Sequence, residues 1–142
     1  MFLGTHTPKI DEKGRFFLPA KFRDDLSAGL VITRAQDRCL AIYPLQTFEV
    51  MTQQVSTAPV TLRQVRDFQR MLAAGASQEM PDKQGRLMIP PALRSYAGLD
   101  KDIVVVGAIN RVEVWDQQAW EIYSTEQETA FAAMNEEVFP GL

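Results

Sequence analysis

A thirteen-residue phrase occurs twice in this chain. Residues 11–23 read D-E-K-G-R-F-F-L-P-A-K-F-R, and 71 positions later residues 82–94 read D-K-Q-G-R-L-M-I-P-P-A-L-R. A weaker echo, at an offset of 72, links residues 42–49 with residues 114–121. Two units of about 70 residues are too few and too long for a solenoid. We therefore expect a pseudo-two-fold domain, in which each half completes the core of the other and any surface site occurs twice.

The chain has the size and composition of one ordinary soluble domain. It contains 142 residues, of which 46% are apolar, and this content is enough for a real core. The sequence lacks an apolar run of membrane-spanning length and the basic and apolar regions of a signal peptide. The single cysteine, Cys39, lies in an apolar stretch and is interpreted as a core residue. These features predict a cytoplasmic protein.

Charge is divided unevenly along the chain. Residues 1–111 hold all 15 Lys and Arg and 11 of the 18 acids, a balance of +4, whereas residues 112–142 carry 7 acids and no Lys or Arg. The net charge of −3 therefore does not exclude a polyanionic partner, because steering depends on local fields. The simplest interpretation of the acidic tail is a solvated helix face.

Each copy of the phrase begins with a turn. Asp at the first position and Gly at the fourth, as in residues 11–14 and 82–85, are typical of a tight turn between two strands. We therefore expect hairpins from residues 5–10 with 15–18, and from residues 77–80 with 86–89. Pro19 and Pro90 cannot donate to a sheet but suit the first turn of a helix, which predicts short helices over 19–26 and 90–97.

The remaining segments complete two similar units. Apolar runs predict buried strands over 30–33, 39–43, 103–106 and 112–115, and polar and apolar spacing predicts helices over 46–54, 62–75, 117–123 and 125–137. We expect a first repeat over 1–56, a connecting helix within 57–75, a second repeat over 76–124 and an acidic helix or tail over 125–142. Together they would form one intertwined domain.

Signatures of enzymes are missing from the sequence. Its only histidine is His6, so a His-dependent triad or a multi-His metal site cannot be built, and neither a Gly-rich phosphate loop nor a Cys pair occurs. His6 is interpreted as a surface or strand residue. No cofactor, metal or small-molecule ligand is expected. A carboxylate enzyme assembled from distant residues is the weakest of the hypotheses.

The doubled turn is the strongest candidate for chemistry. Its Asp and Arg, four positions apart, could simply pair and stabilise a hairpin. Alternatively, Gly lets a backbone approach a ligand closely, and Arg offers a fork suited to phosphate or guanine edges. The residues alone leave both readings open. The basic residues that could form one paired surface are Lys9, Lys13, Arg15, Lys21 and Arg23 in the first copy, and Lys83, Arg86 and Arg94 in the second.

These motifs resemble the bacterial MraZ family. The opening M-F-L-G, the two phrases D-E-K-G-R-x-x-x-P and D-K-Q-G-R-L-x-I-P-x-x-L-R, then V-V-V-G-A and V-E-V-W-D-Q-Q-A-W carry the resemblance, which covers residues 1–123. It implies an α+β, mainly β fold: a double-split β-barrel of the AbrB/MazE-like swapped-hairpin type, made from two copies in one chain. It also implies a ring-shaped homo-oligomer.

The resemblance further implies a transcriptional regulator that binds double-stranded promoter DNA of the division and cell-wall gene cluster, and hence a nucleoid-associated protein. The family's D-x-x-x-R motif would provide the contacts, with Arg15 and Arg86 on base edges and lysines on phosphates. The DNA-binding residues predicted in this way are Asp11, Lys13, Gly14, Arg15, Lys21, Asp82, Lys83, Gln84, Gly85 and Arg86. No family motif covers the tail beyond Tyr123.

A second hypothesis is an antitoxin-like or scaffold protein that binds another protein through the acidic tail.

Apolar residues in that tail have no obvious core to join and predict association into a closed homo-oligomer. They are Phe131, Met134, Val138 and Phe139.

Overall fold

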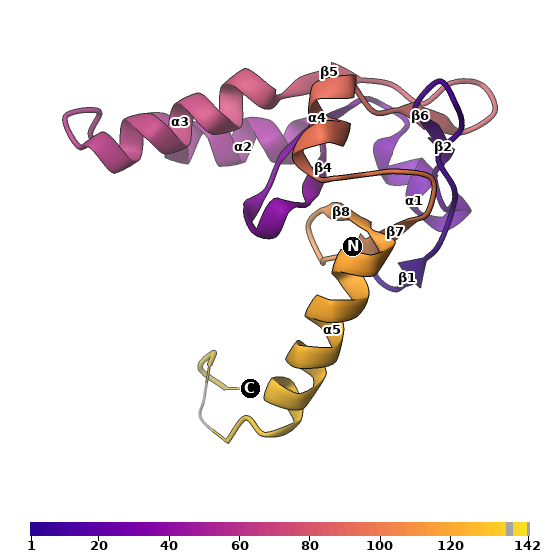
Figure 1. Ribbon diagram of the computed structural model, residues 1–142. Coiled ribbons are helices and arrows are strands. Elements are labelled where there is room, and N and C mark those ends of the chain that lie inside the picture. Colours follow the sequence, from indigo (N-terminus) through magenta and orange to yellow (C-terminus); the bar gives the residue numbers. More distant parts are fainter. Residues whose placement is uncertain (136–137, 142) are drawn as a thin grey trace.

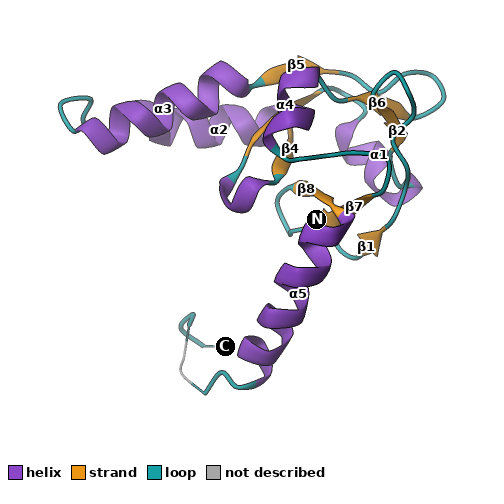
Figure 2. Cartoon of the chain, viewed as in Figure 1, coloured by secondary structure: helices purple, strands orange, loops and turns teal. Residues whose placement is uncertain are grey.

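The computed structural model describes residues 1–135 and 138–141. Within these residues, the strands form a six-stranded antiparallel sheet in the order β1-β7-β8-β4-β3-β5 and a separate two-stranded ribbon of β2 and β6 (Figure 2). The mixed α+β class dominated by antiparallel strands is confirmed. The strands are Thr5–His6 (β1), Arg15–Phe17 (β2), Leu30–Arg34 (β3), Leu40–Pro44 (β4), Ser77–Glu79 (β5), Arg86–Met88 (β6), Ile103–Gly107 (β7) and Val112–Asp116 (β8).

The helices follow the predicted positions closely except near the C-terminus. They are Ala20–Leu26 (α1), the short 3₁₀ turn Gln36–Arg38 (η1), Leu45–Ser56 (α2), Arg63–Gly75 (α3), Pro91–Tyr96 (α4) and Gln117–Ala132 (α5). The prediction of a separate helix over 125–137 is wrong, because α5 runs unbroken to Ala132; Glu136 and Glu137 lie outside the described residues. Ser124 and Thr125 donate to the carbonyl of Glu121, so these hydroxyls are accommodated inside the helix.

The predicted pairing within each hairpin is also wrong. β1 is shorter than predicted and pairs with β7, and β5 pairs with β3. The strands that follow the two turns, β2 and β6, pair with each other, and β4 pairs with β8. Four of the six strand pairs therefore join one copy to the other. Pairing β2 with β6 places the apolar side chains of Phe16 and Leu87 directly opposite each other in the core, which a local hairpin would not do.

One hydrophobic core contains residues from both copies. Buried side chains come from the ribbon (Phe16, Leu87), from α1 and α4 (Phe22, Leu93), and from the inner face of the large sheet. Phe22 and Leu26 lie four apart on one face of α1, and both are buried. On the opposite face of the sheet, Trp115 packs with Trp120 and Tyr123 and attaches the first turns of α5.

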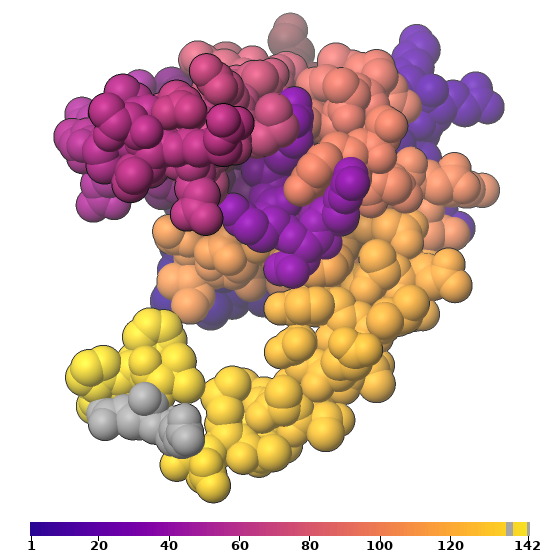
Figure 3. Space-filling view, turned by 60° about the vertical axis from the view of Figure 1, so that its left-hand side comes forward, coloured from indigo at the N-terminus to yellow at the C-terminus, as the bar shows by residue number. Residues whose placement is uncertain are grey.

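Two helical projections extend from this body. α2 and α3 lie side by side and point away from the ribbon, and α5 projects in a different direction (Figure 1). Gln69 donates from α3 to the carbonyl of Val55 in α2, and Thr33 in β3 donates to the carbonyl of Leu72. In the space-filling view, α5 extends outward from the body (Figure 3). Within the described residues, none of the helices is long and apolar enough to cross a membrane.

Replacing Gly107 with alanine should destabilise the fold. Gly107 lies at the end of β7 beneath the N-terminal segment, and a Cβ atom there would overlap the backbone of Phe2 and Leu3. Its amide donates to the carbonyl of Gly4 at 2.8 Å, so the segment cannot move away without losing this bond. We expect Gly107→Ala to lower the free energy of unfolding by about 1 to 3 kcal/mol. Urea denaturation measures this change, and an unaltered midpoint would contradict the packing described.

Candidate nucleic-acid interface

The first turn is closed by the carboxylate of Asp11. Its Oδ1 accepts hydrogen bonds from the backbone amides of Lys13 and Arg15, both at 2.9 Å, and its Oδ2 accepts one from Nε of Arg15 at 2.8 Å. The amide of Gly14 donates to the carbonyl of Asp11, with Gly14 at a φ of +82°. The hydrogen bond from the Arg15 amide is the main cause that lowers the pKa of Asp11. The turn therefore keeps an ionised carboxylate and presents Arg15 in a fixed orientation.

The second turn repeats this geometry. Oδ1 of Asp82 accepts from the amides of Gln84 at 2.9 Å and Arg86 at 2.8 Å, and Oδ2 accepts from Nε of Arg86 at 2.8 Å. The amide of Arg86 is again the main cause of a lowered pKa, here that of Asp82. The ion pair between Asp and Arg that the sequence allows is thus present in both turns. It uses only Nε, and among the described residues the outer nitrogens of both guanidinium groups have no hydrogen-bond partner.

The ribbon brings the two turns together. Arg15 lies opposite Met88 and Phe17 lies opposite Arg86, with Phe16 and Leu87 paired between them. Because side chains alternate along a strand, both arginines lie on the same outer face of the ribbon. At ~3.4 Å per residue, Arg15 and Arg86 are roughly 7 Å apart along the ribbon. The two D-x-x-x-R motifs therefore form one composite surface, and the antiparallel register places one turn at each end of the ribbon.

Two further arginines cross from one copy to the turn of the other. A Cβ atom on Gly14 would lie 2.8 Å from Cζ of Arg94, and one on Gly85 would lie 2.7 Å from Cζ of Arg23. Each guanidinium is oriented by its Nε, which donates to the carbonyl of Ile89 (Arg94, 3.0 Å) or Leu18 (Arg23, 2.9 Å). Both turns need glycine because φ is +82° at Gly14 and +81° at Gly85, and a side chain at either position would also displace the arginine of the other copy.

This crossing could not be read from the sequence. Arg23 and Arg94 stood in the predicted basic surface, but each was grouped with the turn of its own copy. Only the pairing of β2 with β6 places them on the opposite turns, and no local pattern signals that pairing. The same ladder continues into the turns, since the amide of Leu18 donates to Gly85 and that of Ile89 donates to Gly14.

The lysines differ in their placement. Lys13 and Lys83 are exposed on the turns, where Gln84 is exposed as well. Lys21 lies in α1, with its Nζ beside Gly4 and 5.8 Å from the ring centroid of Phe22. Within the described part of the chain, no hydrogen bond or ion pair joins Lys21 to either turn. The structure thus gathers the predicted residues of both turns and sets Lys21 apart.

Comparison with known proteins gives the family. The family model described as "MraZ protein, putative antitoxin-like" matches residues 1–71 and again residues 72–140. The chain belongs to the MraZ family. A protein of Cutibacterium acnes called Transcriptional regulator MraZ is 72% identical over 139 residues, which are 98% of this chain and 98% of that protein. Proteins of the same name from Thermobifida fusca and Kineococcus radiotolerans are 56% and 57% identical over 142 residues, which cover 100% of this chain and 99% of each relative.

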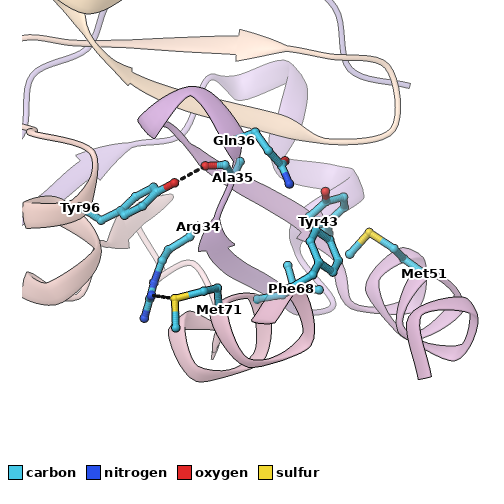
Figure 4. Close-up of a pocket in the computed structure, with 9 residues that line it drawn as sticks. Arg34, Ala35, Gln36, Tyr43, Met51, Phe68, Met71 and Tyr96 are labelled. Atoms are coloured by element: carbon cyan, nitrogen blue, oxygen red, sulfur yellow. Dashed lines mark hydrogen bonds between the residues drawn. The ribbon is translucent and has the colours of Figure 1, made fainter. Parts of the chain in front are cut away.

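A cavity lies elsewhere on this MraZ family member, between α2, α3 and α4. It has a volume of about 180 Å³ and a mostly apolar lining that includes Tyr43, Phe68 and Met71 (Figure 4). The Tyr96 hydroxyl points at the carbonyl of Ala35, 2.6 Å away, and Arg34 donates to the sulfur of Met71. These contacts join the residues just before η1 to α3 and α4, and they place no acid–base pair in the cavity. Cys39 is buried, and burial raises the pKa of its thiol to about 12, in agreement with its interpretation as a core residue.

His6 should make stability depend on pH. Its Nε2 is shielded from solvent and has no hydrogen-bond partner within the described residues, and its ring packs edge-on against Phe22. Burial, together with the nearby Lys21 ammonium, lowers the pKa of His6 below 6.5. The unfolded chain therefore binds this proton more readily, so the stabilisation is complete above about pH 6.5 and is lost as pH falls.

We expect the free energy of unfolding to decrease between about pH 7 and about pH 5, and His6→Gln to remove much of this dependence. Urea denaturation at several pH values measures both effects. If the free energy of unfolding depends on pH equally in the wild type and in His6→Gln, His6 is freely protonated in the folded state.

Proposed function

We propose that this protein is a transcriptional regulator that binds double-stranded DNA with sequence specificity through the outer face of the β2–β6 ribbon and its two turns. The observation that carries the proposal is the register of the ribbon, which holds Arg15 and Arg86 on one face with their outer nitrogens unpaired in the described structure. The names of the relatives from Cutibacterium acnes and Thermobifida fusca support the same function.

The dimensions of the ribbon suit the major groove of DNA. That groove admits a two-stranded ribbon, and arginine forms bidentate contacts there with guanine. The separation of roughly 7 Å between Arg15 and Arg86 corresponds to about two base-pair steps. The two arginines would therefore contact base pairs that are two steps apart in one groove. Lys13, Lys83 and the crossing arginines would bind phosphates, and Lys21 remains a predicted phosphate contact at the edge.

The proposal includes assembly into a closed ring. Phe131, Met134, Val138 and Phe139 are all exposed, as are Phe68 and Met71 on α3. A ring that presents several ribbons along one duplex could raise avidity by ~10² to 10⁴, which supports direct repeats in the promoter as the target. The double-split barrel stays part of this proposal, supported by the strand pairs between copies. Sedimentation should give a species several times the 16.0 kDa chain mass, and a monomer at micromolar concentration would contradict the ring.

A gel shift tests the function directly. The probe is the upstream region of the protein's own operon, proposed to be the division and cell-wall cluster, with a shuffled fragment of equal composition as control. We expect preferential retention of the promoter and a steep loss of affinity as salt rises, because phosphate contacts release counterions. Equal binding of both fragments, or no binding at low salt, would overturn the proposal.

A protein-binding role is the second candidate. The exposed apolar residues on α5 and the lack of Lys and Arg in residues 112–142 favour a partner protein for this helix. The family description as antitoxin-like points the same way. Deleting residues 125–142 discriminates the two functions, since a regulator acting through the ribbon keeps its preference for promoter over shuffled DNA even as loss of the ring lowers its avidity, whereas an α5-directed binder loses its partner.

A further inference from the structure

The outer face of the β2–β6 ribbon carries apolar side chains as well as arginines. Phe17 is 54% exposed and Met88 is 43% exposed, whereas Phe16 and Leu87 on the inner face are fully buried. Phe17 lies directly opposite Arg86, and Met88 directly opposite Arg15. Each guanidinium is therefore paired across the ribbon with an exposed apolar side chain, and the arrangement repeats with the pseudo-two-fold symmetry of the chain.

We propose that Phe17 and Met88 are base-contacting residues that pack against thymine methyl groups in the major groove. This inference rests on the proposed function and adds a second element to base recognition beside the arginines. The methyl group of thymine is the apolar group that the major-groove edges present, and apolar side chains recognise it by contact. With the arginines on guanine, the ribbon would select sites in which guanine and thymine lie within a few base pairs.

The surroundings of the two residues favour DNA over a second protein. Arg15 and Arg86 stand on the same face, and Lys13 and Lys83 are exposed on the flanking turns. None of these four residues forms an ion pair with an acid outside its own turn in the described structure. The turns also carry Asp11, Glu12 and Asp82, but with Arg23 and Arg94 packed against them the bases outnumber the acids six to three. This net positive charge complements a polyanion and disfavours contact with a second copy of the same face.

The test compares thymine with uracil. A promoter fragment synthesised with deoxyuridine in place of thymidine keeps its base pairing and charge but lacks the methyl groups. We expect the wild-type protein to bind this fragment more weakly, by about fourfold for each contacted methyl. Phe17→Ala and Met88→Ala should bind the normal fragment roughly tenfold more weakly, and each should lose less affinity than the wild type on substitution with uracil.

Val50→Ala is the matched control, because Val50 is an exposed apolar residue on α2, away from the ribbon. It should show the wild-type affinity and the wild-type response to uracil. If the two ribbon variants bind like the wild type, or remain equally sensitive to uracil, the inference is overturned while the proposed function stands. If they change the sedimentation of the protein instead, the face is a protein interface and the inference is again wrong. If the wild type does not bind the normal promoter fragment at all, the proposed function itself is contradicted.

Discussion

Arg15→Ala and Arg86→Ala are each expected to weaken binding to promoter DNA by at least about 100-fold without unfolding the protein. One bidentate contact from arginine to guanine provides ~1 to 3 kcal/mol of discrimination, and the loss is multiplied when several copies bind one duplex. The fold should persist, because each arginine forms a partly exposed ion pair with the aspartate of its own turn, and the backbone amides that close the turn on that aspartate remain in the alanine variant. Fluorescence anisotropy with labelled DNA measures the affinity, and circular dichroism measures the fold.

Two further variants separate charge from geometry. Arg15→Lys keeps the charge but loses the planar fork, so it should retain salt-dependent binding and lose the preference for promoter over shuffled DNA. Arg111 pairs with Glu113 and lies far from both turns in the sequence. The Arg111→Ala variant should therefore bind promoter DNA as tightly as the wild type does. If Arg111→Ala and Arg15→Ala weaken binding equally, general charge rather than the ribbon determines affinity.

Residues 1–75 alone are expected to fail to fold as a monomer. In the intact chain β1 pairs with β7, β2 with β6, β4 with β8 and β3 with β5, and all of these partners lie beyond residue 75. Only the pairing of β3 with β4 would remain, and an isolated two-stranded hairpin is marginally stable at best. The core would also lose Leu87, Ile89 and Val114, which are fully buried.

Urea denaturation followed by circular dichroism should therefore show no cooperative transition for the fragment, whereas the full chain shows one. Self-association of the fragment is the other permitted result, because a second copy can supply strands equivalent to the missing ones. A monomeric fragment with a sharp unfolding transition would contradict the account of a shared core.

Local chemistry explains what the sequence could predict. The turns at residues 11–14 and 82–85 depend on Asp and Gly a few positions apart, and the structure places their hydrogen bonds as that chemistry requires. Pro19 and Pro90 correctly marked the starts of α1 and α4. The resemblance of the motifs to one family was confirmed by the match to both repeats.

The features that the sequence did not predict depend on contacts between residues far apart in the chain. The sequence predicts a local hairpin in each copy, whereas β2 pairs with β6 of the other copy. Because β2 and β6 have similar sequences, their residue patterns do not indicate which of the two pairings forms. The packing of Arg94 on Gly14 follows from that exchange. The sequence predicts separate helices over 117–123 and 125–137, whereas α5 is continuous to Ala132, with Ser124 and Thr125 bonded to the carbonyl of Glu121 in the preceding turn.

Site-directed crosslinking tests the ribbon and its turns as the DNA-binding surface most directly. Cys39 is the only cysteine of the sequence, so in a Cys39→Ala background each introduced cysteine is the single thiol of the protein. Lys13→Cys and Gln84→Cys place a thiol on either turn, and Gln53→Cys places one on α2 as a control. With promoter DNA that carries a thiol tether in the major groove, we expect disulfide crosslinks from positions 13 and 84 and none from position 53. Crosslinking at position 53 with none at the turns would contradict the proposed interface.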